Sequence, residues 1–105
     1  MTKVGDRVGA ILRADEKTVE LIGYGSYIGD EIPHDKVAAM GNILREAAIP
    51  NPKIQLDSGK DVFGCECWWG SEEKVKSTIG NRKIVEVDID EIRRGHAHDR
   101  QKEIY

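Results

Sequence analysis

The sequence predicts an α+β domain: a small five-stranded antiparallel SH3-like β-barrel with a helical insertion and a C-terminal helix. Short segments with alternating apolar residues recur five times in the 105-residue chain, and turn residues separate them. One amphipathic helical pattern interrupts this series. The alternative is a more open antiparallel sheet with that helix packed on one face. We expect a single domain over residues 1–105, with its barrel core at about 4–90 and an extension at about 91–105.

The first two strands are expected at residues 4–12 and 18–24, which form a hairpin across a polar turn. The glycine-rich segment 23–30 follows, and it lacks the GxxxxGK[ST] pattern of a phosphate-binding loop. We therefore interpret its glycines as the cause of a bend or bulge. If this segment binds a ligand, Tyr24 and Tyr27 are the side chains able to stack on it.

A helix is predicted over residues 34–48. Pro33 suits the first turn of a helix, because the missing N–H would have no partner there. Apolar residues then recur at three- and four-residue spacing: Val37, Met40, Ile43, Leu44 and Ala47. Pro50 ends the pattern.

Residues 53–56 and 61–70 are expected to form a second hairpin, joined by the tight turn 57–60. The second of these strands holds both cysteines, both tryptophans and the only phenylalanine. A two-residue period separates its side chains into an apolar face of Phe63, Cys65, Cys67 and Trp69 and a second face of Val62, Gly64, Glu66 and Trp68. We expect the apolar face to lie in the core, with both thiols buried and reduced.

The remaining elements are a short helix, a fifth strand and a last helix. Ser71 is a predicted N-cap, Gly80 a predicted C-terminal glycine, and Val75 and Ile79 should face inward between them. Residues 83–89 alternate as a strand, and Asp90 can cap a helix over 91–105. That helix is sparsely apolar, so we expect it to fray unless a partner covers it.

The run NPKIQLDSGKDVFGCECWWG, followed by KIVEVDID, resembles small accessory proteins encoded by tailed phages and prophages. The resemblance covers about residues 50–90. It implies a mobile-element setting and carries over no catalytic residues.

Composition narrows the classes of partner. Sixteen basic and 19 acidic residues give a net charge of −3, which argues against nucleic acid as the partner. No apolar run is long enough for a membrane span, and the first residues lack the apolar core of a signal peptide. We expect a cytoplasmic protein of the host cell.

The sequence predicts neither a metal site nor a nucleophilic cysteine. Metal-ligand types occur at Cys65, Cys67, His96, His98 and Asp99, but Cys-x-Cys lacks the two-residue spacer of common zinc sites. A nucleophilic cysteine would need a positioned histidine, and nothing in the sequence places His34 beside one. No metal, cofactor or catalytic residue is therefore predicted, and binding is favoured over catalysis.

The predicted site is an aromatic and acidic groove formed by Trp68, Glu66, Tyr24 and Tyr27. The indole offers a stacking surface, and the carboxylate accepts hydrogen bonds from an amino edge or a guanidinium. The competing interpretation packs Trp68 beneath helix 34–48.

The function predicted from this groove is a non-enzymatic phage or prophage accessory binding protein. It would recognise a small nucleotide-like ligand or a segment of a host protein. The alternative is a structural or assembly subunit that forms a homo-oligomer through Trp68 and the C-terminal helix. A hydrolase or transferase comes third.

Overall fold

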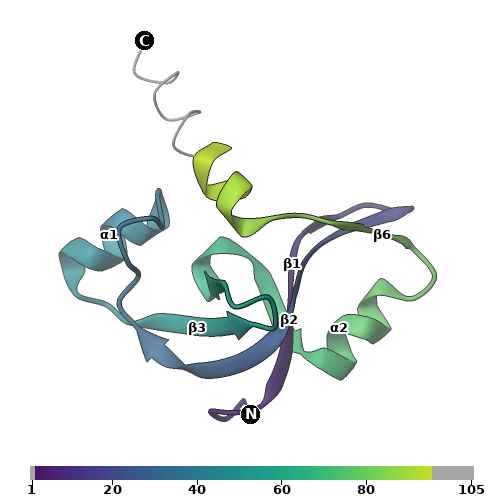
Figure 1. Ribbon diagram of the computed structural model, residues 1–105, viewed down its shortest axis with the longest axis horizontal. Coiled ribbons are helices and arrows are strands. Elements are labelled where there is room, and N and C mark those ends of the chain that lie inside the picture. The colour runs from purple at the N-terminus through teal and green to yellow at the C-terminus, as the bar shows by residue number, and fades with distance from the viewer. Residues whose placement is uncertain (1, 96–105) are drawn as a thin grey trace.

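The computed structural model describes residues 2–95, and in this part of the chain one sheet separates two helices at opposite ends of the molecule (Figure 1). The strand order is β4-β3-β2-β1-β5, and β6 pairs with β2 outside this path. The elements in chain order are β1 (Arg7–Ala14), β2 (Thr18–Glu31), α1 (Met40–Ala47), β3 (Asn51–Leu56), β4 (Asp61–Phe63), the 3-10 turn η1 (Gly64–Glu66), β5 (Trp68–Ser71), α2 (Glu72–Ile79) and β6 (Lys83–Glu86). A third helix occupies residues 89–95.

The predicted α+β class is confirmed, and five of the strands form an antiparallel path. The sixth strand, β6, runs parallel to β2. Within residues 2–95 the two outer strands of the path, β4 and β5, are not paired with each other, so the sheet is open. None of the helices in this part of the chain is long and apolar enough to cross a membrane.

The long strand β2 organises the sheet. It pairs with β1 along its first part and with β3 along its second, while β6 borders only residues 18–21 on the outer edge. The strand does not stop at Tyr24 as predicted but continues through the glycine-rich segment. Gly23 and Gly29 have φ angles of 151° and 110°, and the register with β3 shifts beside Gly29. The predicted bend is thus confirmed, and it lies inside the strand.

Strands β2 and β3 approach each other closely at Gly25. A Cβ atom on this residue would lie 2.1 Å from the carbonyl oxygen of Gln55 and 2.7 Å from the Cα of Leu56. Both are backbone atoms, so they cannot move aside as a flexible side chain would. Only glycine fits here without displacing β3.

The core consists of two hydrophobic clusters. The first joins β1, β3 and β4 to the start of helix 89–95 and comprises Val8, Ala10, Ile54, Leu56, Val62 and Ile89. The second lies between the sheet and α2 and comprises Ile11, Val19, Leu21, Val75 and Ile79. The predicted inward direction of Val75 and Ile79 is therefore confirmed, as is the N-cap: Ser71 Oγ accepts a hydrogen bond of 3.2 Å from the Lys74 backbone N–H.

The predicted single strand over 61–70 is wrong, because η1 interrupts it. The Glu66 carboxylate accepts a hydrogen bond of 3.0 Å from the Phe63 backbone N–H, and Asn51 Oδ1 accepts one of 2.8 Å from the Cys65 backbone N–H. These side chains take the place of a ladder partner, so the chain turns there. The alternation of faces is lost: Phe63 is buried, whereas Cys65 and Cys67 are only half-buried.

The predicted helix 34–48 begins six residues late, at Met40. Ala39 has a φ of 52° and breaks the helix before that point. Met40 and Ile43, two of the apolar residues that predicted the helix, are exposed, and the buried residue of α1 is Gly41. Val37 packs against Gly41 so closely that a Cβ there would lie 2.5 Å from Val37 Cγ1. The closest packing of α1 is thus at the backbone of Gly41 rather than at its apolar side chains.

The C-terminal elements also differ from expectation. The strand predicted over 83–89 ends at Glu86, and the last helix begins at Ile89 rather than after Asp90. Its first turns are not peripheral, since Ile92 packs on the first cluster and Arg93 is buried. The rest of the predicted helix, from residue 96, lies outside the described residues.

Replacing Gly25 with Ala should destabilise the fold by about 3 kcal/mol, because the added methyl group must displace backbone. Gly70→Ala is the matched control, since within 4 Å its new methyl group meets only the flexible Lys74 side chain, at 3.8 Å, among residues 2–95. Urea unfolding of both variants tests this difference. Equal, small losses of stability would show that β2 and β3 are not held this close.

Candidate functional site

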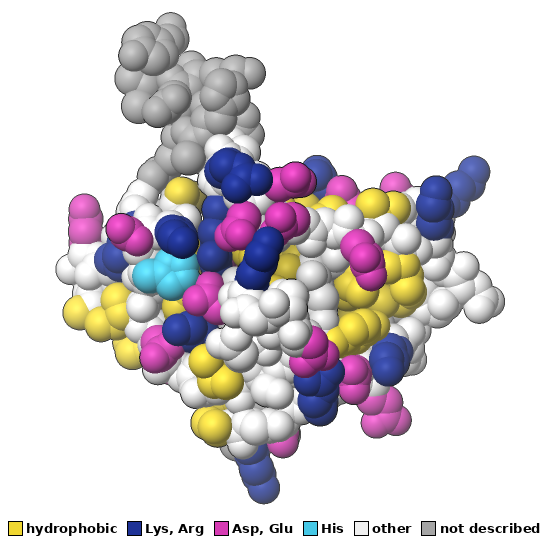
Figure 2. Space-filling view, viewed as in Figure 1, with side chains coloured by type: hydrophobic (Ala, Val, Ile, Leu, Met, Phe, Trp, Pro, Cys, Tyr) yellow, Lys and Arg dark blue, Asp and Glu magenta, His cyan; other side chains and the backbone are white. Residues whose placement is uncertain are grey.

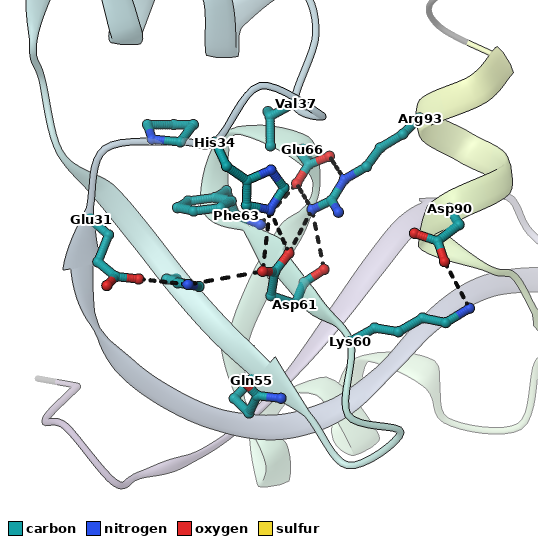
Figure 3. A network of polar contacts seen from close by, with 12 residues as sticks. Glu31, His34, Val37, Gln55, Lys60, Asp61, Phe63, Glu66, Asp90 and Arg93 are labelled. Atoms are coloured by element: carbon teal, nitrogen blue, oxygen red, sulfur yellow. Dashed lines mark hydrogen bonds and ion pairs between the residues drawn. The ribbon is translucent and has the colours of Figure 1, made fainter.

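Arg93 lies at the centre of a buried polar network (Figure 3). Its guanidinium donates hydrogen bonds of 2.9 and 2.8 Å to the two carboxylate oxygens of Glu66. It also donates to Asp61, at 3.0 Å to the carboxylate and 3.1 Å to the backbone carbonyl. The helix 89–95 is thereby tied to β4 and η1 by a paired, nearly water-free cation.

The network continues from Asp61 toward the segment before α1. His34 Nε2 lies 3.0 Å from Asp61 Oδ1, and the histidine ring meets the Phe63 ring edge-on. Burial alone would raise the pKa of Asp61, but the hydrogen bonds from His34 and Arg93 outweigh it and lower that pKa. Asp61 is therefore held as a paired carboxylate, and it ties the segment before α1 to β4 and to the helix 89–95.

The cysteines do not have the properties of nucleophiles. Burial raises the pKa of the Cys67 thiol to about 12 and raises that of Cys65 as well. A reactive cysteine needs a lowered thiol pKa, because the thiolate is the nucleophile. The surroundings of Cys65 and Cys67 shift the pKa in the opposite direction.

Within residues 2–95 no three side chains of His, Cys, Asp or Glu are grouped as a metal site would require. His96, His98 and Asp99, which have side chains of metal-ligand type, lie outside the described residues.

The four residues of the predicted groove do not share one surface. Glu66 is withdrawn into the Arg93 network, and only Trp68, at 44% exposure, offers an open indole. Tyr27 stacks on Trp69 with ring centroids 5.7 Å apart. Tyr24 packs with the second cluster instead. The groove predicted around Trp68 and Glu66 is thus not formed, because η1 turns Glu66 inward.

The competing interpretation, with Trp68 packed beneath helix 34–48, is also wrong. Helix α1 contacts η1. Trp68 instead lies on the outer strand β5, where its backbone is opposite Ile11 of β1. Its indole therefore stays exposed.

A cleft of about 510 Å³ lies along the edge of β2. On this edge β6 pairs with residues 18–21 and β3 pairs with residues 25–31, and the cleft opens between the two. We call it the β2 cleft. Its lining residues are Leu21, Ile22, Gly23 and Tyr24 of β2, Leu56, Asp57, Ser58 and Lys60 of the β3–β4 hairpin, and Glu86, Val87, Asp88 and Ile89. Backbone hydrogen bonds of 2.9 Å hold both walls to β2, from Val87 to Leu21 and from Asp57 to Tyr24.

The floor of the β2 cleft is apolar and its rim is acidic. Figure 2 shows hydrophobic side chains on this face with acidic and basic side chains beside them. Asp57 accepts two hydrogen bonds from Arg7, at 2.7 and 2.6 Å, and Asp88 pairs with Lys60 at 2.8 Å. Glu86 forms no ion pair with any residue between 2 and 95. One carboxylate of the rim is therefore available to a ligand.

Of the predicted site residues, only Tyr24 lines this cleft. The sequence pattern of residues 83–89 places Glu86 on the polar side of a strand, which is a weak signal shared by many surface acids. The cleft itself depends on where two strands meet β2, and no local motif encodes that.

Comparisons with known proteins give no family to which the chain can be assigned. No family model matches it, and neither does any curated protein or solved structure.

Arg93→Met should destabilise the protein by about 3 to 5 kcal/mol, because it leaves the nearly buried Glu66 carboxylate without its cation and takes one partner from Asp61. The neighbouring Arg94 is exposed, so Arg94→Met should change stability by less than about 0.5 kcal/mol. Chemical denaturation of the two variants measures both values. A small loss for Arg93→Met would show that the helix is not anchored through this residue.

The two adjacent tryptophans should respond differently to truncation. Trp69→Ala removes the stack with Tyr27 and packing against the first cluster, and should cost about 3 kcal/mol. Trp68→Ala removes an exposed side chain and should cost less than about 1 kcal/mol. Thermal unfolding measures the stability of the two variants, and acrylamide quenching measures the exposure of the two indoles. Similar losses of stability, with equal quenching of both indoles, would contradict the assignment of Trp69 as packed and Trp68 as exposed.

Proposed function

We propose that this protein is a non-enzymatic binding module that takes a segment of another protein into the β2 cleft. The observation that carries the proposal is the combination of an apolar floor with an acidic rim in one cavity of about 510 Å³. Protein segments bring apolar side chains and hydrogen-bonding backbone together, which suits such a cleft.

The acidic rim favours one of the two ligand classes expected from the sequence. The phosphates of a nucleotide-like ligand would lie near Asp57, Glu86 and Asp88, and like charges repel across such short distances. A neutral or cationic protein segment meets no such penalty. We therefore favour the protein segment over the nucleotide.

We further propose that the sheet is a variant of the SH3-like barrel and that the protein is a phage or prophage accessory protein of the host cytoplasm. The order β4-β3-β2-β1-β5, with a 3-10 turn between β4 and β5, favours the SH3-like assignment. Folds of this kind bind peptide segments in aromatic grooves, although the fold alone does not decide function. The phage setting rests on the sequence resemblance over residues 50–90.

The second candidate function is an assembly subunit. Its support is the exposed indole of Trp68 on the outer strand β5, together with exposed Met40 and Ile43 on α1. Light scattering separates the two functions: a homo-oligomer that Trp68→Ala dissociates favours assembly, and a monomer favours the binding module.

A random peptide library displayed for selection against the full chain tests the binding module. Selected peptides should shift the NMR signals of residues 21–24, 56–60 and 86–89. Glu86→Lys should weaken their binding about tenfold or more, because it reverses the charge of the rim. Glu46→Lys on the exposed face of α1 is the matched control and should leave affinity unchanged. Selection of no peptide, or shifts confined to other surfaces, would overturn the proposal, as would binding of ATP in this cleft.

A further inference from the structure

Lys60 places a cation at the mouth of the β2 cleft. It is the last residue of the turn 57–60, and its side chain reaches across to Asp90 in the first turn of helix 89–95 (Figure 3). Its ammonium lies 2.8 Å from Asp88 Oδ1 and 3.1 Å from Asp90 Oδ2. Hydrogen bonds to Asp88 and Asp90 raise the pKa of Lys60, so the group stays charged. The cleft already contains one intramolecular cation bound by its acidic rim.

This cation is held loosely. The side chains of Lys60, Asp88 and Asp90 are 43%, 38% and 40% exposed. Exposed ion pairs contribute little to stability, since water and salt screen them. Lys60 can therefore leave Asp88 without a large loss of stability, in contrast to Arg93, whose side chain is 8% exposed.

The rim carries more negative charge than Lys60 and Arg7 neutralise. Lining the cleft are three carboxylates, those of Asp57, Glu86 and Asp88, and one ammonium, that of Lys60. Arg7 satisfies Asp57 from outside the cleft. Glu86 is left without an ion pair among the described residues, on the same wall as Asp88.

We infer that the segment bound in the β2 cleft carries a lysine or arginine whose charge meets Glu86 and Asp88, and that Lys60 competes with it for Asp88. In the bound segment, apolar residues next to that lysine or arginine contact the floor of the cleft, which Leu21, Ile22 and Leu56 form. The inference rests on the proposed function and adds the chemistry of the partner to it.

The probe is the peptide acetyl-Leu-Arg-Leu-Arg-Leu-amide, compared with a second peptide in which citrulline replaces both arginines. Citrulline keeps the shape of arginine and removes its charge. NMR titration of the isotope-labelled full chain should locate the arginine peptide at residues 21–24, 56–60 and 86–89. The citrulline peptide should bind about tenfold more weakly, and added salt should reduce the difference.

Two variants test the competition. Lys60→Met keeps the aliphatic stem but removes the ammonium, so it should tighten the arginine peptide about threefold to tenfold and leave the citrulline peptide unchanged. Glu86→Gln should weaken the arginine peptide alone. Lys36→Met and Glu46→Gln are the matched controls, at exposed positions that do not line the cleft, and should change neither affinity.

The outcomes separate this inference from the proposed function. Equal affinity of the two peptides, failure of both to bind, or no gain from Lys60→Met in a folded variant would overturn the inference. In each case library-selected peptides that shift cleft residues would leave the proposed function standing. If Lys60→Met fails to unfold cooperatively, the Glu86→Gln result decides.

Discussion

The buried ion pair between Arg93 and Glu66 is the constraint on which the C-terminal half of the structure depends. Glu66 also accepts a hydrogen bond from the Phe63 backbone, so one carboxylate shapes η1 and receives the helix 89–95. Asp61 links the same guanidinium to His34, which precedes α1. Segments far apart in sequence are thereby joined at one point. Because Arg93 and Glu66 are withdrawn from water together, removing the cation leaves the Glu66 carboxylate unpaired.

The bend in β2 has the opposite effect, since it separates strands rather than joining them. Gly23 and Gly29 adopt φ angles that other residues rarely accept, and β2 can therefore turn from β6 toward β3 along its outer edge. Among the described residues the strands that flank this edge, β6 and β3, are not paired with each other, and the β2 cleft lies between them. The cleft thus arises from the path of the backbone. Because the strands part above the core, apolar side chains such as Leu21 and Leu56 form its floor.

Local features of the sequence predicted local structure well. The N-cap Ser71, the hairpin turn 57–60 and the glycine-rich bend each depend on residues close in sequence. The failures involve distant partners. The strand pattern at 61–70 is broken by Asn51, and Glu66 is drawn inward by Arg93, 27 residues away. An arginine in a charged segment gives no sequence signal of burial, because its burial depends on carboxylates that only the fold brings near. The predicted groove failed for this reason.

The wall of the β2 cleft formed by residues 86–89 lies between two cation–carboxylate contacts of different strength. On one side Arg93 is buried and fixes the helix that follows the wall. On the other side Lys60 is exposed and holds Asp88 and Asp90 only through water-screened pairs. A ligand cation can therefore replace Lys60 while the wall stays anchored through Arg93. The same chemistry, a cation between carboxylates, is structural where water is excluded and exchangeable where water has access.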